Sequence, residues 1–140
     1  MLRHIRKFVI GSTIWLILLL SKLMIMGFPL KRFQWLIGRP LNKQNEKWNQ
    51  NVTGFQKKRA WKTGRIIERA SKKTCWRSVC LDQSLAAAIV FRLLKIPFRF
   101  HLGLMRQDKL KAHAWISCGE LIVTGRHNKN QFSEISVFAK

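Results

Sequence analysis

The sequence predicts an α+β domain in which a central helix packs on a small antiparallel sheet, preceded by an apolar N-terminal helix. Three observations lead to this prediction. Residues 8–30 are almost continuously apolar. Two later segments, 54–71 and 81–94, carry apolar residues at helical spacing or nearly all round. From residue 98 onward the apolar period becomes two, and turn residues separate the short runs, which is typical of hairpin-connected strands.

Length and composition limit the possible classes of protein. The 140 residues suffice for one compact domain with a real core, and the 47% hydrophobic content excludes a disordered basic tail. The 27 Lys and Arg against 6 Asp and Glu give a net charge of +21, which favours an anionic partner such as lipid headgroups, nucleic acid or an acidic peptide. Three cysteines, an odd number, argue against a disulfide framework and leave at least one free thiol.

The first unit, residues 1–40, is a helical segment with basic flanks, and Lys22 interrupts its apolar run. Three interpretations compete. A signal peptide would need a small-residue cleavage site, which the residues around Lys22 do not supply. A membrane-spanning helix needs about 20 apolar residues and would have to tolerate Lys22. We favour the third, a long helix that packs on the domain or lies at a membrane surface with its cationic ends on anionic headgroups.

The second unit, residues 54–140, follows a polar segment that reads as a loop over 42–53. Its first helix, 54–71, should bury one side, formed by Trp61, Ile66, Ile67 and Ala70. Its second helix should be the buried centre of the fold. Strands are expected over three segments, with a tight turn at Gly119-Glu120 between the last two: 98–104, 111–118 and 121–124.

One pair of residues suggests chemistry. Ser78 is a plausible helix N-cap, which would place Cys80 in the first turn of the central helix. The helix dipole and the free backbone N–H groups at that position favour a thiolate and can hold an oxyanion. If the strands lie against this helix, His113 can reach the sulfur as its base, as in papain-like and transglutaminase-like enzymes. The alternative is a buried structural cysteine and an ordinary strand histidine.

A specific set of sequence blocks strengthens this pair. The blocks are Cys80-Leu81-Asp82-Gln83-Ser84-Leu85-Ala86, Arg92-Leu93-Leu94-Lys95-Ile96-Pro97, Leu102-Gly103-Leu104, Ala112-His113-Ala114-Trp115 and Cys118 to Gly125, with Phe132 after them. In this order and spacing they resemble the transglutaminase-like leader peptidase of lasso-peptide biosynthesis, the B-type microcin-processing protein. The apolar N-terminal helix resembles that of stand-alone members without a leader-recognition domain.

The resemblance implies a cysteine peptidase with Cys80 as nucleophile and His113 as base, acting through a thioester without metal or cofactor. The family often adds an aspartate that orients the histidine, and here no acidic candidate stands at the expected place. A turn at Gly119-Glu120 puts His113 opposite Arg126, with Thr124 and Asn128 diagonal, and a slip of one residue brings in Gly125. The third residue is therefore left open between Thr124, Asn128, a backbone carbonyl and a dyad without one.

The same resemblance implies partners: a lasso precursor peptide as substrate, a leader-recognition protein and an ATP-dependent lasso cyclase. We expect a cytoplasmic protein, located at the inner face of the membrane if the N-terminal helix binds an anionic surface. No nucleic-acid partner is expected, because the basic residues are spread along the chain. Two alternatives stay open: a non-enzymatic basic protein that associates with membrane or nucleic acid, and another cysteine acyl-transfer enzyme, which would use an amine instead of water.

Overall fold

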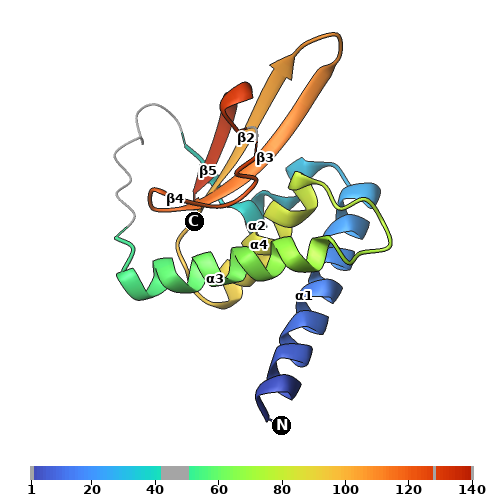
Figure 1. The fold of residues 1–140 in the computed structure, drawn as a ribbon. Helices are drawn as coiled ribbons and strands as arrows, with labels where there is room; N and C mark the ends of the chain where they lie inside the picture. The colour runs from blue at the N-terminus through green and yellow to red at the C-terminus, as the bar shows by residue number, and fades with distance from the viewer. Residues whose placement is uncertain (1, 42–50, 128, 140) are drawn as a thin grey trace.

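The computed structural model describes residues 2–41, 51–127 and 129–139, and Figure 1 shows its helices and strands. In chain order they are α1 (Leu2–Gly27), the 3-10 helix η1 (Leu30–Phe33), α2 (Gln34–Ile37), β1 (Arg39–Pro40), α3 (Gly54–Ser71), α4 (Cys80–Leu93), β2 (Arg99–Arg106), β3 (Leu110–Cys118), β4 (Leu121–Thr124), the 3-10 helix η3 (Lys129–Gln131) and β5 (Ser133–Ala139). The predicted α+β class is confirmed. Of the predicted polar loop, residues 42–50 lie outside the described residues.

The strands form one antiparallel sheet in the order β1-β5-β2-β3-β4. Strands β2 and β3 form a long hairpin in which Gly103 pairs with His113 and His101 pairs with Trp115. Strand β5 returns from the end of the chain to the other edge of β2. Strands β5 and β1 were not predicted from the sequence, and the sheet is wider than the expected three strands.

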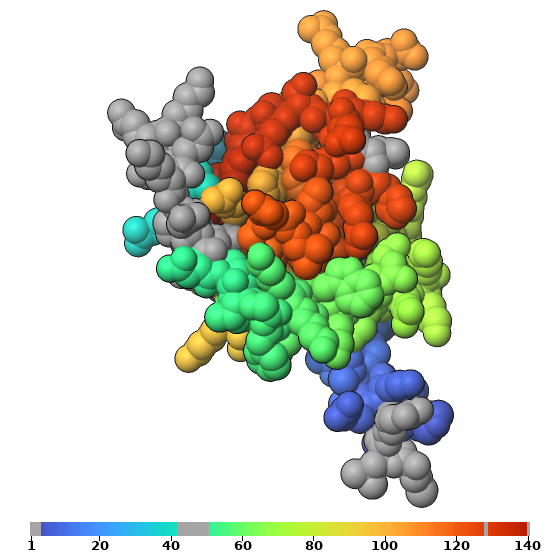
Figure 2. Space-filling view, turned by 60° about the vertical axis from the view of Figure 1, so that its left-hand side comes forward, coloured from blue at the N-terminus to red at the C-terminus, as the bar shows by residue number. Residues whose placement is uncertain are grey.

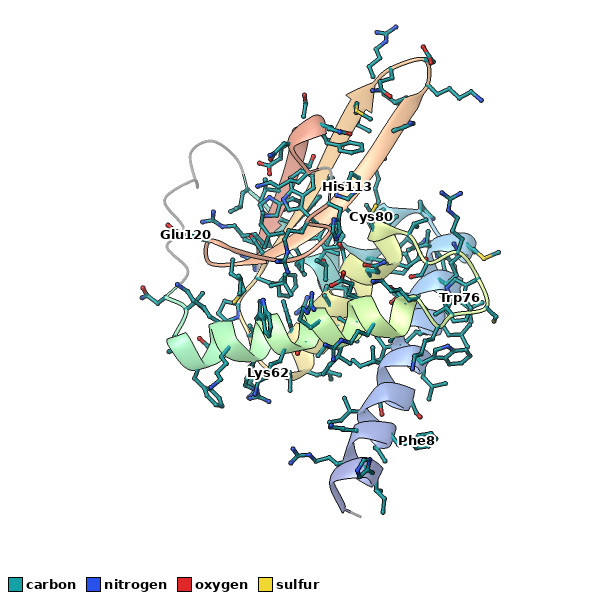
Figure 3. The ribbon with its side chains drawn as sticks, in the orientation of Figure 1. Phe8, Lys62, Trp76, Cys80, His113 and Glu120 are labelled. Carbon is teal, nitrogen blue, oxygen red and sulfur yellow. The ribbon has the colours of Figure 1, made fainter. Side chains whose placement is uncertain are left out.

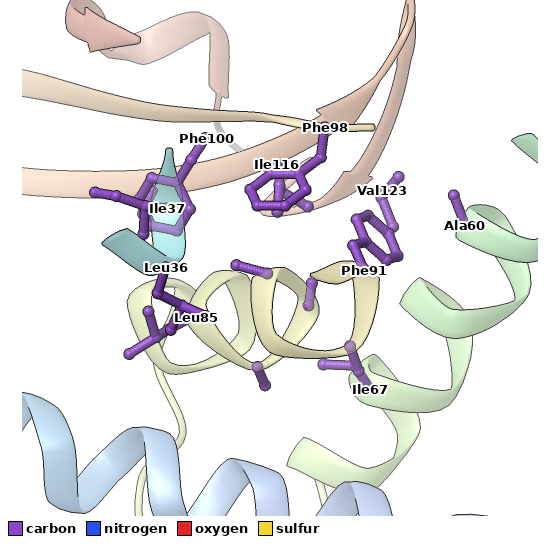
Figure 4. Packing of buried hydrophobic residues seen from close by; sticks show 14 of the residues in the cluster. Leu36, Ile37, Ala60, Ile67, Leu85, Phe91, Phe98, Phe100, Ile116 and Val123 are labelled. Atoms are coloured by element: carbon purple, nitrogen blue, oxygen red, sulfur yellow. The ribbon is translucent and has the colours of Figure 1, made fainter. Parts of the chain in front are cut away.

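Helix α4 lies between the sheet and the two other long helices, and contacts α1, α3 and β3. Leu85, Phe91 and the three alanines between them are fully buried. Figure 4 shows this side of α4 packed under Phe98 and Ile116 of the sheet layer, and the rings of Phe91 and Phe98 lie 6.0 Å apart. Burying each such large side chain contributes about 1.5–3 kcal/mol. The prediction of a buried central helix is confirmed.

Helix α3 holds the other edge of the sheet in place. It begins at a capping box, in which the hydroxyl of Thr53 accepts a hydrogen bond from the Gln56 N–H at 3.2 Å and the Gln56 side chain accepts one from the Thr53 N–H at 3.0 Å. Ile67 is fully buried, whereas Trp61 is 45% exposed, so the prediction that Trp61 lies on the buried side is wrong. A side chain at Gly64 would collide with Val123 of β4, and the absence of one lets α3 and β4 pack closely.

Helix α1 packs on the body of the protein by one side only. Ile14, Leu18 and Ser21 are buried against α3 and α4, while the outward side and the N-terminal end stay exposed. Figures 1 and 2 show this end projecting away from the rest of the molecule. Residues 4–27 are long and apolar enough to cross a membrane by length and composition, although part of that stretch is buried against the domain.

Lys22, which interrupts the apolar run of α1, has a partner in the fold. Its Nζ lies 3.7 Å from Oδ2 of Asp82, whose side chain is completely buried. The same oxygen accepts a hydrogen bond from the N–H of Val79 at 3.1 Å, directly before α4. An acidic group in this position satisfies a free N–H and complements the helix dipole. Helix α1 therefore supports the start of α4.

This arrangement corrects the expected cap of α4. The N-cap residue is Val79, one position after the predicted Ser78, and its N–H bonds to the carboxylate of Asp82. The hydroxyl of Ser78 is buried and has no hydrogen-bond partner in the described part of the chain. The carboxylate of Asp82, within the first turn, therefore caps the helix in place of the N-cap hydroxyl that is common at helix starts.

Candidate active site

Cys80 is the first residue of α4 and is half-buried, as the sequence predicts. The first hydrogen bond into the helix runs from the N–H of Gln83 to the carbonyl oxygen of Val79, at 3.2 Å. The N–H groups of the preceding turn therefore have no acceptor within the helix. They and the positive end of the helix dipole lie beside the sulfur, and both favour negative charge there.

His113 lies on β3, half-buried, and its ring is held by the backbone. Its Nε2 lies 2.7 Å from the carbonyl oxygen of Gly125. A carbonyl oxygen only accepts, so Nε2 must donate and therefore carries the proton. In the neutral ring Nδ1 is then an acceptor, and within the described residues it has no hydrogen-bond partner. Nδ1 is therefore the nitrogen available to take a proton.

Cys80 and His113, 33 positions apart in the sequence, line one cavity of about 320 Å³. Figure 3 shows the two side chains next to each other, where the start of α4 meets β3. The contact between α4 and β3 that brings them together also buries the hydroxyl of Ser84, which donates to the Ala114 carbonyl oxygen at 3.2 Å. The structure thus brings together the two residues that the sequence singled out.

The group that holds His113 is the backbone carbonyl of Gly125, one of the possibilities left open. The β3–β4 register shifts by one residue between Ile116 and Ser117, so the chain after β4 is displaced relative to the register expected from the turn. Gly125 has φ +69°, and a Cβ there would collide with the carbonyl oxygen of Ala114. Only glycine readily combines that backbone angle with such a close approach to β3.

The other candidates for the third position have different roles. Thr124 is buried, and its hydroxyl lies 3.0 Å from that of Ser84, so it joins β4 to α4 instead of reaching His113. Glu120, in the turn between β3 and β4, is exposed. Asn128 lies outside the described residues.

Aromatic rings fix the plane of the His113 imidazole. The ring of Phe132 lies 4.8 Å from it and the ring of Trp115 5.7 Å, both tilted by 29°. Opposite His113 on β2 stands Gly103, where a Cβ would press on both Trp115 and Phe132. Gly103 therefore leaves the space into which the two rings pack.

Five polar residues that line the cavity were not expected there from the sequence. Gln83 lies one turn after Cys80 on the predicted helix. This helical spacing is the one feature of the sequence that could have identified it as a residue of the cavity. Two cations and one carboxylate come from α3 and the β4–β5 connection: Arg65, Arg126 and Glu68. The carboxylate of Glu68 lies 3.4 Å from Arg65 and 3.8 Å from the fifth residue, His127. These groups make this part of the cavity lining polar, with two arginines and one carboxylate.

A second polar cluster lies on the outer face of the sheet. The Nε2 of His101 is 2.8 Å from the hydroxyl of Ser117, and its Nδ1 is 2.7 Å from a carboxylate oxygen of Glu134. Burial lowers the pKa of His101, against the opposite influence of Glu134. The ring also stacks on Trp115 at 5.3 Å. Since Ser117 is buried and the cluster lines no described cavity, we interpret it as a structural network.

The two remaining cysteines lie outside the cavity. Cys118 is fully buried in the core, and burial raises the pKa of its thiol, although Lys57 acts in the opposite direction. Cys75 is exposed. Of the three free thiols, Cys80 alone shares a cavity with a histidine.

One comparison with known proteins finds a match. The model of the transglutaminase-like superfamily matches residues 24–137, most of the chain, including both residues of the candidate pair. No curated protein and no solved structure matches the chain.

Proposed function

The chain belongs to the transglutaminase-like superfamily, which includes cysteine peptidases and acyltransferases, and from this we propose that it is a cysteine peptidase that removes the leader from a lasso-peptide precursor. Cys80 is the nucleophile of this reaction and His113 its base. The observation that carries the proposal is the cavity that Cys80 and His113 share, together with the hydrogen bond from Nε2 of His113 to Gly125, which leaves Nδ1 without a partner among the described residues.

The reaction follows from this proton arrangement. The sulfur of Cys80 attacks the carbonyl carbon of the amide that joins leader to core, and the thiol proton passes to Nδ1 of His113. The resulting imidazolium gives this proton to the leaving amine, which becomes the N-terminus of the core peptide. Water, deprotonated by His113, then hydrolyses the thioester, which releases the leader as a carboxylic acid and restores the thiol.

Two kinds of donor are positioned for the oxyanion of the tetrahedral intermediates. The free N–H groups of the first turn of α4 point out of the helix end beside Cys80. The side-chain amide of Gln83 lines the same cavity and supplies a neutral donor. We assign Gln83 an oxyanion-stabilising role, which predicts that Gln83→Ala lowers kcat by about 10²-fold and changes KM little.

The choice of a leader peptide as substrate rests on the sequence blocks around both catalytic residues, above all Cys80-Leu81 with its following helix and Ala112-His113-Ala114-Trp115. Of the two arginines that line the cavity, Arg65 is paired with Glu68, and Arg126, which forms no ion pair in the described part of the chain, suits a substrate with an acidic side chain. The leader-recognition protein would deliver the precursor and the ATP-dependent cyclase would close the ring of the product. We place leader removal in the cytoplasm, where precursor peptides are synthesised.

The function is tested by incubating the chain with a precursor peptide and the leader-recognition protein, with and without an added primary amine, and weighing the products by mass spectrometry. A peptidase gives the free leader acid and the free core. An acyltransferase instead gives a leader–amine adduct in proportion to the amine added. If the precursor stays intact under all conditions with a folded chain, the peptidase proposal is wrong.

A further inference from the structure

A second cavity, of about 800 Å³, lies between α1 and α3, away from Cys80 and His113, and we call it the α1–α3 groove. On its apolar side are Phe8, Ile10 and Trp15. On its polar side are three cations, Lys7 of α1, Arg69 of α3 and Lys73 just beyond α3. No acidic residue lines it. We propose that the α1–α3 groove binds an anionic phospholipid of a membrane surface, a binding that does not depend on the peptidase function.

The charge of the groove selects an anionic headgroup. Lys7, Arg69 and Lys73 converge on it from two parts of the chain. None of the three forms an ion pair in the described structure, whereas Arg65, one turn before Arg69, is paired with Glu68. Cations near an anionic bilayer each strengthen binding, and three converging cations match a phosphate group.

The apolar surface of α1 selects a bilayer over a short acidic peptide. It continues from the groove along the whole exposed side of the helix, which includes Phe8 at 76% exposed and Met26 at 74% exposed. A helix of 26 residues extends about 39 Å, and only residues between Lys7 and Leu16 of α1 line the groove, so the apolar surface extends beyond it. Soluble monomers rarely expose so large a contiguous apolar surface. Aromatic and cationic side chains side by side are typical of helices at membrane interfaces.

The docking of α1 determines how it meets the bilayer. Leu18 and Ser21 are fully buried against the domain, and Lys22 pairs with Asp82, so one side of the helix is occupied by protein. A helix held in this way is surrounded by lipid on its free side only. The bound state is therefore a helix that lies in the headgroup region, with the groove cations of α3 at the same level.

The proposal is tested by flotation of the full chain with phosphatidylcholine vesicles and with vesicles that also contain phosphatidylglycerol. We expect binding to the second kind only, decreasing with added salt. The triple variant Lys7→Gln/Arg69→Gln/Lys73→Gln should weaken this binding about a hundredfold. The matched control Arg106→Gln/Lys109→Gln/Lys111→Gln removes the same charge from the tip of the β2–β3 hairpin, on the other side of the molecule (Figure 2), and should weaken it by less than about tenfold.

A third variant tests the apolar half of the site. Phe8→Ser leaves the fold unchanged because the ring is exposed, and should weaken binding about tenfold. Equal losses in the groove variant and the hairpin control would show that net charge alone is responsible, which overturns the proposal. Unchanged vesicle binding by Phe8→Ser overturns the proposal as well. So does the absence of binding to either kind of vesicle by the folded chain. Circular dichroism of each variant checks that the helices are intact.

Discussion

Lys22 on α1 and Asp82 on α4 form an ion pair, with Nζ 3.7 Å from Oδ2, directly beneath the start of the helix that carries Cys80. Asp82 is fully buried, and one of its oxygens, Oδ1, has no partner among the described residues. A residue that looked like an interruption of an apolar helix is thus the counter-ion of a buried carboxylate. Helix α1 and the candidate active site are parts of one structural unit.

Replacing Lys22 by Met should destabilise the fold. The substitution keeps the length and packing of the side chain but leaves Asp82 buried without its cation, at a cost of about 2 kcal/mol. Urea denaturation gives the free energy of unfolding, and Lys62→Met, on the exposed side of α3, is the matched control expected to stay within about 0.5 kcal/mol of wild type. Equal stabilities of the two variants would show that the pair contributes nothing.

Gly125→Ala should damage catalysis more than stability alone explains. The new Cβ meets the Ala114 carbonyl oxygen, so the backbone must move and its own carbonyl leaves Nε2 of His113. The imidazole then loses its fixed tautomer, and kcat for precursor cleavage should fall about 10²-fold. Gly54→Ala, at a position with open space, is the control. A folded Gly125→Ala variant with normal kcat would remove the carbonyl from the mechanism.

Alkylation should distinguish the three thiols. Cys118 is buried with a raised pKa, so iodoacetamide should modify it only after unfolding. Cys80 should react faster than the more exposed Cys75, because the helix end and His113 activate it. In His113→Ala that advantage should disappear. Peptide mass spectrometry over a time course measures all three rates, and a faster reaction at Cys75 than at Cys80 in wild type would contradict the activation.

The His101 network should make stability depend on pH. Burial lowers the folded-state pKa of His101 below the unfolded value of 6.5, so the unfolded chain binds the proton more tightly. The contribution is complete above pH 6.5 and is lost as the pH falls from there toward the folded value. Between about pH 7.5 and pH 5.5 wild type should therefore lose more unfolding free energy than His101→Gln. A larger loss in the variant would mean that the ion pair with Glu134 outweighs burial.

The sequence was informative wherever a local pattern determines structure. Residues 81–94 are apolar on nearly every side of a helix, which predicts that the helix is buried. The structure has α4 over Cys80–Leu93. The capped, amphipathic segment 54–71 is α3 to the residue. Strand β5 was missed because Ser133 to Ala139 has a weak alternation, and its place between β1 and β2 is determined by tertiary pairing.

In the candidate site, too, local patterns could be read from the sequence and tertiary contacts could not. Cys80 and His113 could be named from their expected positions at a helix start and on a strand, together with the sequence blocks around them. The partner of His113 could not, because it is a backbone carbonyl just beyond the end of β4, and the one-residue shift in the β3–β4 ladder changes the register of that segment, whereas turn residues alone do not reveal a bulge. The role of Lys22 was hidden for a similar reason: only the packing of α1 on α4 brings Asp82 within its reach.

The most direct test of the account is mass spectrometry of a precursor peptide incubated with the leader-recognition protein and either wild type, Cys80→Ala or Cys75→Ala. We predict cleavage at the leader–core junction by wild type and Cys75→Ala, a transient leader thioester on Cys80 in both, and an intact precursor with Cys80→Ala. Cleavage by folded Cys80→Ala at the wild-type rate would contradict the central claim that Cys80 is the nucleophile.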